Sequence, residues 1–110
     1  MMDHNRLSAD TIHMALSLSR TLVSVPDHVI TRAVGGNTVI LDVQSGRSFT
    51  LDAVGSRVWA LLSETGSAQQ TRDALLTEFE VEPAELERDL VSLLTQLAEG
   101  ALLSLSERPA

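Results

Sequence analysis

The chain of 110 residues is long enough for one domain with a modest core, and 44% of its residues are apolar, which favours a folded protein over a disordered one. It contains no cysteine, so disulfides, thiolate nucleophiles and cysteine metal sites are excluded. With 15 acidic and 8 basic residues, its formal charge of −7 repels nucleic acid and anionic lipid and favours a basic or neutral partner.

Residues 1–22 have the least regular pattern of the chain. The segment Ile12–Val25 is the only candidate for a targeting sequence, but His13 and Arg20 interrupt it, and no apolar run approaches the length of a membrane span. We therefore expect a cytoplasmic protein with a flexible arm at residues 1–22 and a short strand near Ser17–Ser24. A partly disordered terminus is an equally weighted alternative.

Three short β-rich segments follow, separated by turn residues. The predicted strands are Val29–Thr31, Thr38–Val43 and Arg47–Leu51, with turns at Gly35-Gly36-Asn37 and Gln44-Ser45-Gly46. Glycine and asparagine tolerate the positive φ that such turns require. These segments predict a three-stranded antiparallel meander with one apolar face.

Alternation along the strands assigns their side chains to faces. In the second strand, Ile40 lies opposite the face that three other apolar residues share. In the third strand, Phe49 and Leu51 alternate with the polar Ser48 and Thr50. Because the meander needs one apolar face, we expect Phe49 and Leu51 to point inward, under the helices.

Three helices are predicted between residues 53 and 100. Asp52 is a suitable N-cap for the first helix, and Gly66-Ser67 separates the first helix from the second. Pro83 fits the first turn of the third helix, where its missing N–H has no consequence. Gly100 would form the C-cap of the third helix, and Ala101–Leu105 a short final strand.

Apolar residues recur at helical spacing in all three helices and predict their buried faces. In chain order these are Val54, Val58, Trp59, Leu61, Leu62, Ala74, Leu75, Phe79, Leu86, Leu90, Leu93, Leu94 and Leu97. The order of elements predicts an α+β fold of winged helix-turn-helix type. In this fold a three-stranded meander is followed by three helices and then by a short C-terminal strand. We expect a domain at residues 23–105 and a tail at residues 106–110.

No catalytic or metal centre is predicted. The three histidines, His4, His13 and His28, have no partner at metal-ligand spacing. Gly35-Gly36 lacks the pattern of a phosphate-binding loop, and Gly46–Thr50 lacks the final glycine of a nucleophile elbow. We expect no catalytic residue, no bound metal and no cofactor.

A helix-turn-helix also raises the question of DNA binding. The third predicted helix, Pro83–Glu99, carries four acidic residues against Arg88 alone and contains no lysine. Because a recognition helix normally brings positive charge to the phosphates, we expect no nucleic-acid partner. An acidic winged-helix regulator remains a rival interpretation.

A meander has free edges, whose unpaired N–H and C=O groups can accept an extended peptide as an added strand. The segment Arg47–Leu51 is short and carries small polar side chains on one face. From the pattern alone, a peptide-docking edge and an edge that is merely tolerated have equal weight.

Three stretches resemble the PqqD-like family. They are Ser24–Arg32, Asn37–Leu62 and Asp89–Leu103, and together they span most of residues 24–105. The most specific part is the pattern L-D-x-x-G-x-x-x-W-x-L-L at Leu51–Leu62. With the form G-x-x-x-W, the chain resembles the stand-alone proteins of lasso-peptide pathways more than the proteins of quinone-cofactor synthesis.

This resemblance implies a non-catalytic recognition element for the leader segment of a ribosomally made precursor peptide. It implies that the leader adds as an antiparallel strand beside Arg47–Leu51, against the third helix, and is delivered to a modifying enzyme or leader protease. The implied peptide-binding residues are Arg47, Ser48, Phe49, Thr50, Leu51, Glu85, Leu86, Asp89, Leu90 and Leu93.

The residues around this groove add chemical detail. We expect apolar leader residues to fill pockets near Leu86, Leu90 and Leu93, and the acidic helix to favour a leader that carries lysine or arginine. A peptide chaperone of pyrroloquinoline quinone synthesis and a general protein-docking domain remain alternatives. The sequence does not determine the oligomeric state.

Overall fold

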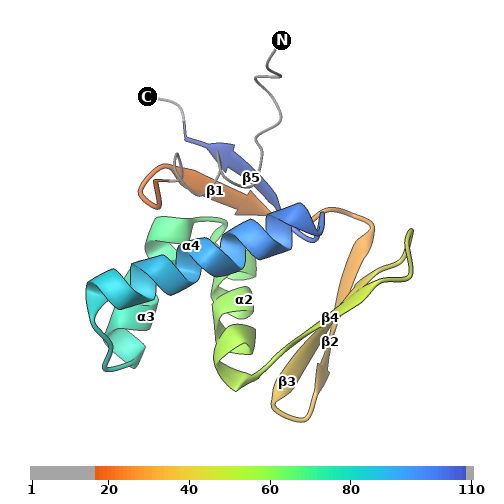
Figure 1. The fold of residues 1–110 in the computed structure, drawn as a ribbon, viewed down its shortest axis with the longest axis horizontal. Helices are drawn as coiled ribbons and strands as arrows, with labels where there is room; N and C mark the ends of the chain where they lie inside the picture. The colour runs from red at the N-terminus through yellow and green to blue at the C-terminus, as the bar shows by residue number, and fades with distance from the viewer. Residues whose placement is uncertain (1–16, 109–110) are drawn as a thin grey trace.

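Two small antiparallel sheets and three helices make up residues 17–108, the part of the chain that the computed structural model describes (Figure 1). In chain order the elements are β1 (Thr21–Ser24), β2 (Val29–Val34), β3 (Asn37–Asp42), β4 (Ser48–Leu51), α2 (Ala53–Thr65), α3 (Ala68–Glu78), α4 (Pro83–Glu99) and β5 (Ser104–Glu107). β1 pairs with β5, and the other strands form a separate sheet in the order β2-β3-β4. The predicted α+β class with antiparallel strands and three helices is confirmed, but the strands are split between two sheets.

The sheet of β1 and β5 joins the two ends of the described chain. Thr21 lies opposite Glu107, and the backbone N–H of Arg108 donates to the carbonyl of Arg20 at 2.6 Å. The short strand predicted near Ser17–Ser24 is therefore present, and its pairing with the end of the chain was not predicted. The domain boundary expected at residue 23 falls inside this strand.

The final strand begins later than predicted, at Ser104 instead of Ala101. Ala101 has a φ of 60°, in the left-handed region, and the next two residues, Leu102 and Leu103, are buried. The chain completes this turn before it becomes extended. The strand therefore lies further along the chain than predicted and includes residues 106 and 107, which were expected to belong to the tail. The arm up to residue 16, with His4 and His13, and residues 109–110 lie outside the described residues.

The three-stranded sheet turns one apolar face toward the helices. Ile40 lies opposite Thr31 on β2 and Phe49 on β4, so these side chains share a face. Ile40 is fully buried, and Leu51 is buried on the same face. Phe49 is half-buried and packs against the core, so both β4 side chains point inward as predicted.

The pattern at Leu51–Leu62 has a direct physical explanation at the junction of β4 and α2. The carboxylate of Asp52 accepts the N–H of Gly55 at 2.8 Å and caps α2. A Cβ at position 55 would lie 3.2 Å from the Cβ of Leu51, so glycine allows the helix to start close to the strand. Trp59 follows one turn later and is buried in the core.

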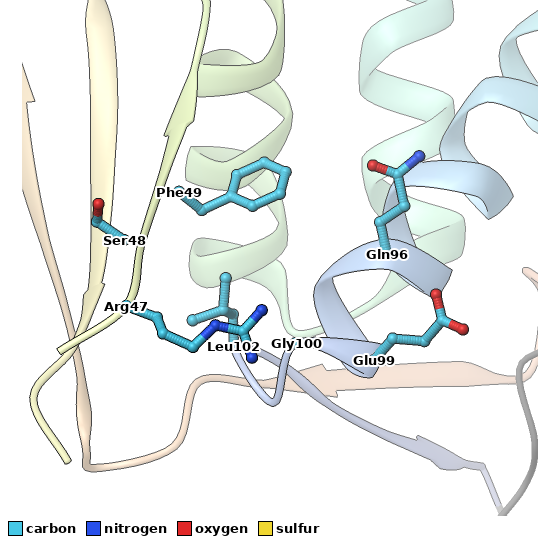
Figure 2. Close-up of a pocket in the computed structure, with 7 residues that line it drawn as sticks. All are labelled: Arg47, Ser48, Phe49, Gln96, Glu99, Gly100 and Leu102. Atoms are coloured by element: carbon cyan, nitrogen blue, oxygen red, sulfur yellow. The ribbon is translucent and has the colours of Figure 1, made fainter. Parts of the chain in front are cut away.

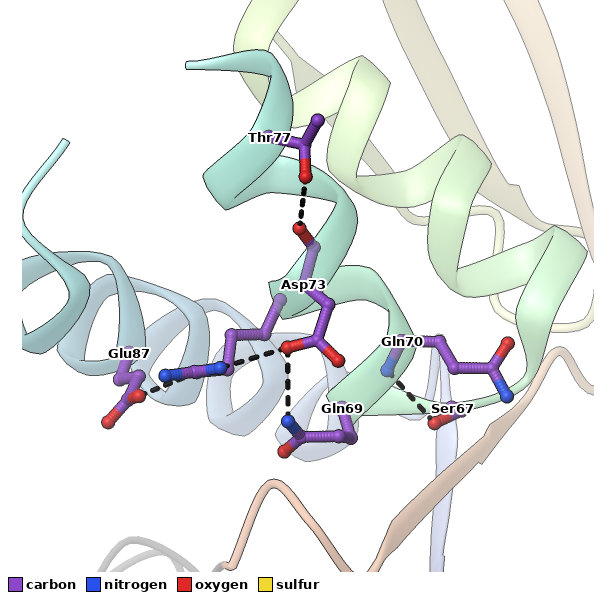
Figure 3. Close-up of polar contacts among 7 residues, drawn as sticks. Ser67, Gln69, Gln70, Asp73, Thr77 and Glu87 are labelled. Carbon is purple, nitrogen blue, oxygen red and sulfur yellow. Dashed lines mark hydrogen bonds and ion pairs between the residues drawn. The ribbon is translucent and has the colours of Figure 1, made fainter. Parts of the chain in front are cut away.

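The other helix ends also follow from local residue chemistry. Gly66, with a φ of 65°, ends α2 in the left-handed region. The hydroxyl of Ser67 accepts the N–H of Gln70 at 3.2 Å and caps α3 (Figure 3), and Pro83 lies in the first turn of α4. No helix within residues 17–108 is long and apolar enough to cross a bilayer.

The core lies between the helices and the inner face of the larger sheet. Its buried apolar residues are Val23, Val29, Ile40, Leu51, Val58, Trp59, Leu61, Leu62, Ala68, Leu75, Leu90, Leu94, Leu97, Leu102 and Leu103. Two residues predicted to be buried are exposed, Val54 at 57% and Phe79 at 39%, and three more, Ala74, Leu86 and Leu93, are only partly buried. Val54 lies in the first turn of α2, at the edge of the core, and Phe79 lies just beyond the end of α3 in an extended conformation.

Ion pairs connect the three helices at their surface. Arg57 of α2 donates two hydrogen bonds to Glu78 of α3, at 2.8 and 2.7 Å, and these bonds hold the pKa of Glu78 below its ordinary value. Arg72 of α3 donates to Glu87 of α4 at 2.6 Å and to Asp73 at 2.9 Å. Figure 3 shows Glu87 and Asp73 on their two helices. Glu87 is therefore an ion-pair partner of α3.

Candidate functional site

The turn between β3 and β4 positions the start of β4. The carboxylate of Asp42 accepts the N–H groups of Gln44 and Ser45 at 2.9 and 3.3 Å. Burial raises the pKa of Asp42, but these hydrogen bonds outweigh burial and hold its pKa below the ordinary value. Gly46 has a φ of 77°, which a larger residue would adopt only with strain. This glycine therefore allows the tight turn that leads into Arg47.

The free edge of β4 presents the backbone groups of Ser48 and Thr50. The N–H of Asp42 donates to the carbonyl of Arg47 at 2.9 Å, which marks this pair as hydrogen-bonded. Because hydrogen-bonded pairs alternate along an antiparallel ladder, Phe49 bonds toward β3, whereas Ser48 and Thr50 direct their N–H and C=O groups away from it. β4 has no second strand partner among residues 17–108, so these groups are available to an added strand.

A hollow of about 310 Å³ lies between β4 and the C-terminal end of α4, and we call it the strand hollow. It is lined by Arg47, Ser48, Phe49, Gln96, Glu99, Gly100 and Leu102 (Figure 2). In Figure 2 the ring of Phe49 points across the gap toward α4, where Gln96 and Glu99 stand on the opposite wall. The start of β4 therefore faces a helix across a recess.

A second hollow of about 350 Å³, the helix hollow, lies among the three helices. It is lined by Val54, Gly55, Val58, Leu75, Phe79, Glu80, Val81, Leu86, Asp89, Leu90 and Leu93. Most of these side chains are apolar, and Glu80 and Asp89 are the charged ones. A hollow of this composition suits an apolar side chain of a ligand, and its two carboxylates can bind a polar or basic group.

The two hollows are acidic in balance. Their linings contain the carboxylates of Glu80, Asp89 and Glu99 and the single guanidinium of Arg47. Three negative charges and one positive charge leave −2. A basic extended ligand therefore fits this surface better than an acidic one.

The structure brings most of the predicted site residues to these two hollows. Arg47, Ser48 and Phe49 line the strand hollow. Leu86, Asp89, Leu90 and Leu93 line the helix hollow. Thr50 is exposed on the free edge of β4, and Leu51 is buried on the inner face of the same strand. Glu85 is exposed, and none of these three residues lines a hollow.

Several lining residues were missed by the sequence analysis. Val54 and Phe79 had been assigned to the core by their helical spacing, yet both are exposed and line the helix hollow. Glu99 and Leu102 reach the strand hollow because α4 ends beside the start of β4. An acidic residue in the last turn of a helix is an anomaly that a sequence can reveal.

The described residues around the site hold no metal-ligating cluster, and their one histidine has a backbone partner. Within residues 17–108 there is no group of three or more metal-ligating side chains. The Nε2 atom of His28 lies 3.2 Å from the carbonyl oxygen of Ala101, so this histidine connects the start of β2 with the loop after α4. An exposed backbone edge beside two recesses can hold an extended polypeptide.

Comparison with known protein families identifies the chain. The sequence profile of PqqD, described as coenzyme PQQ synthesis protein D, matches residues 37–103, more than half of the chain. The chain belongs to the PqqD family. The matched segment runs from the start of β3 to the end of the turn after α4, so it includes both hollows of this PqqD-family chain.

Two solved structures have the same fold as this member of the PqqD family. One, "TbiB1 in Complex with the TbiA(beta) Leader Peptide", is 38% identical, with a TM-score of 0.70, and the match covers 74% of this chain and 94% of that one. The other, "Lasso peptide synthetase B1 complexed with the leader peptide", is 24% identical, with a TM-score of 0.69 and coverage of 74% and 96%, and bears on the fold alone. A search of curated proteins finds no significant match.

Proposed function

We propose that this PqqD-family chain is a non-catalytic recognition element that binds the leader segment of a ribosomally synthesised precursor peptide. The leader adds to the free edge of β4 as an antiparallel strand, pairing with Ser48 and Thr50, and lies against α4. The bound precursor is then delivered to a modifying enzyme or a leader protease in the cytoplasm.

The observation that carries this proposal is the free edge of β4 facing α4 across the strand hollow. Backbone pairing alone would accept almost any extended chain, so specificity has to come from side-chain recesses beside the edge. The helix hollow supplies such a recess for apolar leader residues, near Leu86, Leu90 and Leu93. We assign peptide contact to these leucines and to Arg47–Thr50, with Asp89 at the rim.

A lasso-peptide pathway is the better supported setting. The 38% identical TbiB1 was solved with its leader peptide and spans nearly the same fold. The family description supports a second setting, in which the chain acts as a peptide chaperone of coenzyme PQQ synthesis. Binding of a lasso-type leader or of a quinone-cofactor precursor would distinguish the two.

We infer that recognition belongs to residues 23–105 and that the helices and the β2-β3-β4 sheet follow a winged-helix layout, with the sheet in the place of the wing. The strand β1 crosses the start of this range. A chain truncated before Ser17, which keeps β1 intact, should therefore bind the leader like the full chain.

Isothermal titration calorimetry provides the direct test. The ligands are the leader of the precursor encoded beside this chain and, as a defined probe, the TbiA(beta) leader. We expect saturable binding of one leader per chain. If correctly folded protein binds neither leader, nor a quinone-cofactor precursor, the proposed function is wrong.

A further inference from the structure

Glu99 stands where helix electrostatics disfavour an acid. It is the last residue of α4, whose final turn contains no basic residue. The carbonyl groups at a helix C-terminus carry partial negative charge, so a carboxylate there is repelled. Glu99 is exposed and has no ion-pair partner in the described part of the chain. A residue that breaks a local rule without compensation in the fold is expected at a functional site.

The surroundings of Glu99 suit a long basic side chain. In the strand hollow, Glu99 and the amide of Gln96 occupy the α4 wall, and Phe49 and Leu102 provide apolar surface. The aliphatic stem of a lysine or arginine can lie on this apolar surface while its charged end meets the carboxylate and the last carbonyls of α4.

Arg47, whose side chain reaches from β4 toward Leu102 and Gly100 (Figure 2), is the one positively charged residue in this lining and would favour an acidic side chain there. Against it stand Glu99, the negative end of α4 and the net charge of −7. The balance therefore favours a cation.

The spacing of the two hollows predicts where this cation lies in the leader. The α4 residues that line the helix hollow have their midpoint near residue 90. Those that line the strand hollow, at the end of α4, have their midpoint near residue 98. Eight helical residues correspond to about 12 Å, which an extended peptide covers in about four residues. A leader antiparallel to β4 runs from the Leu51 end to the Arg47 end, so its N-terminal part meets the helix hollow first.

We propose that the strand hollow is a subsite for a lysine or arginine side chain of the bound leader, held by Glu99, about four positions C-terminal to an apolar residue in the helix hollow. This assignment rests on the proposed leader-binding function of β4. It defines a two-point motif, apolar then basic, that the chain selects in its ligand.

A displayed library of random peptides tests the motif independently of any particular leader sequence. The library is sorted against the wild-type chain and against Glu99→Gln, Glu99→Arg and Thr50→Pro. Glu64→Gln is the matched control, because Glu64 is likewise an exposed acid in the last turn of its helix, α2, and lines neither hollow.

We expect the wild type and Glu64→Gln to enrich peptides with a basic residue about four positions after an apolar one. Glu99→Gln should lose the basic preference, and Glu99→Arg should select acidic residues at that position. For one enriched peptide, replacing its basic residue by glutamine should weaken binding to the wild type by about two- to fivefold, the range of an exposed charge pair, and leave binding to Glu99→Gln unchanged.

The outcomes separate this assignment from the proposed function. Enrichment that requires Thr50 but shows no basic preference, or a basic preference that survives in Glu99→Gln, overturns the Glu99 subsite and leaves strand addition intact. An acidic preference in the wild type also overturns it, because Arg47 would then be the binding group. Failure of the wild type to enrich any peptide beyond Thr50→Pro contradicts both proposals.

Discussion

Thr50→Pro is the substitution that most directly tests strand addition at β4. The N–H of Thr50 points away from β3, toward the free edge, so proline removes a donor that the fold itself does not use. The same change on the other edge of the sheet is a matched control. Val43 donates to the carbonyl of His28 at 2.9 Å, and the alternation from this pair places the N–H of Thr31 on the free edge of β2.

The expected loss of affinity follows from the hydrogen bond that proline removes. A backbone hydrogen bond contributes about 1 kcal/mol net, and a peptide carbonyl left unpaired in the groove costs at least about 1–2 kcal/mol more. The sum of about 2–3 kcal/mol corresponds to a Kd about 30- to 150-fold weaker. The side chain of Thr50 is not involved, so Thr50→Ala should bind within about twofold of the wild type.

Fluorescence anisotropy with a labelled leader peptide measures these affinities. Urea unfolding, followed by the emission of the buried and only tryptophan, Trp59, shows whether each variant is folded. We expect Thr50→Pro and Thr31→Pro to have similar unfolding free energies, and only Thr50→Pro to lose leader binding. If Thr31→Pro loses binding while a folded Thr50→Pro keeps it, the docking edge is β2 and the reasoning is wrong.

Three further predictions concern single positions. Ala101→Gly should raise the unfolding free energy by about 0.5–1 kcal/mol in urea titrations, because Ala101 has a φ of 60°. Hydrogen bonds from Arg57 lower the pKa of Glu78, so this pair stabilises the fold fully above the ordinary pKa of 4.5, and the contribution is lost as pH falls through the lowered pKa. Glu78→Gln should therefore reduce the loss of unfolding free energy between about pH 5 and pH 3, and an unchanged pH profile would contradict this origin. Val54→Asp should weaken leader binding at least about tenfold by placing charge in the helix hollow, whereas Val43→Asp, similarly exposed at 53% but outside both hollows, should not.

The elements that the sequence predicted well depend on neighbours within a few residues. The cap at Asp52, the close approach at Gly55 and the burial of Trp59 belong to one continuous pattern. Strand alternation placed Phe49 and Leu51 on the inner face for the same reason. Such features are visible in a sequence because a single turn of helix or a few strand residues determine them.

Helical spacing misassigned Val54 and Phe79, and the reason is geometric. Periodicity identifies the apolar side of a helix but not how far along its length the neighbouring elements cover it. Val54 lies at the start of α2 and Phe79 just beyond the end of α3, where the covering helix leaves a recess. The apolar spacing that predicts the core therefore includes two residues that line a candidate binding surface.

Two further features require contacts between distant parts of the chain. The pairing of β1 with β5 joins Thr21 to Glu107, and neither short strand has a pattern strong enough to predict its partner. Likewise, the sequence can show that Glu99 lies at a helix end that disfavours an acid, but Glu99 becomes a candidate ligand-binding group only because α4 ends beside Arg47 and Phe49.

By itself, the sequence determined the element types, most helix ends, the inward face of β4 and the family, because capping, alternation and a specific motif are local properties. Only the tertiary structure decided which free strand edge lies beside a recess, which apolar residues line a recess, and which acid faces it. Those properties depend on where α4 lies relative to the sheet and the other helices, and no spacing along the chain encodes that arrangement directly.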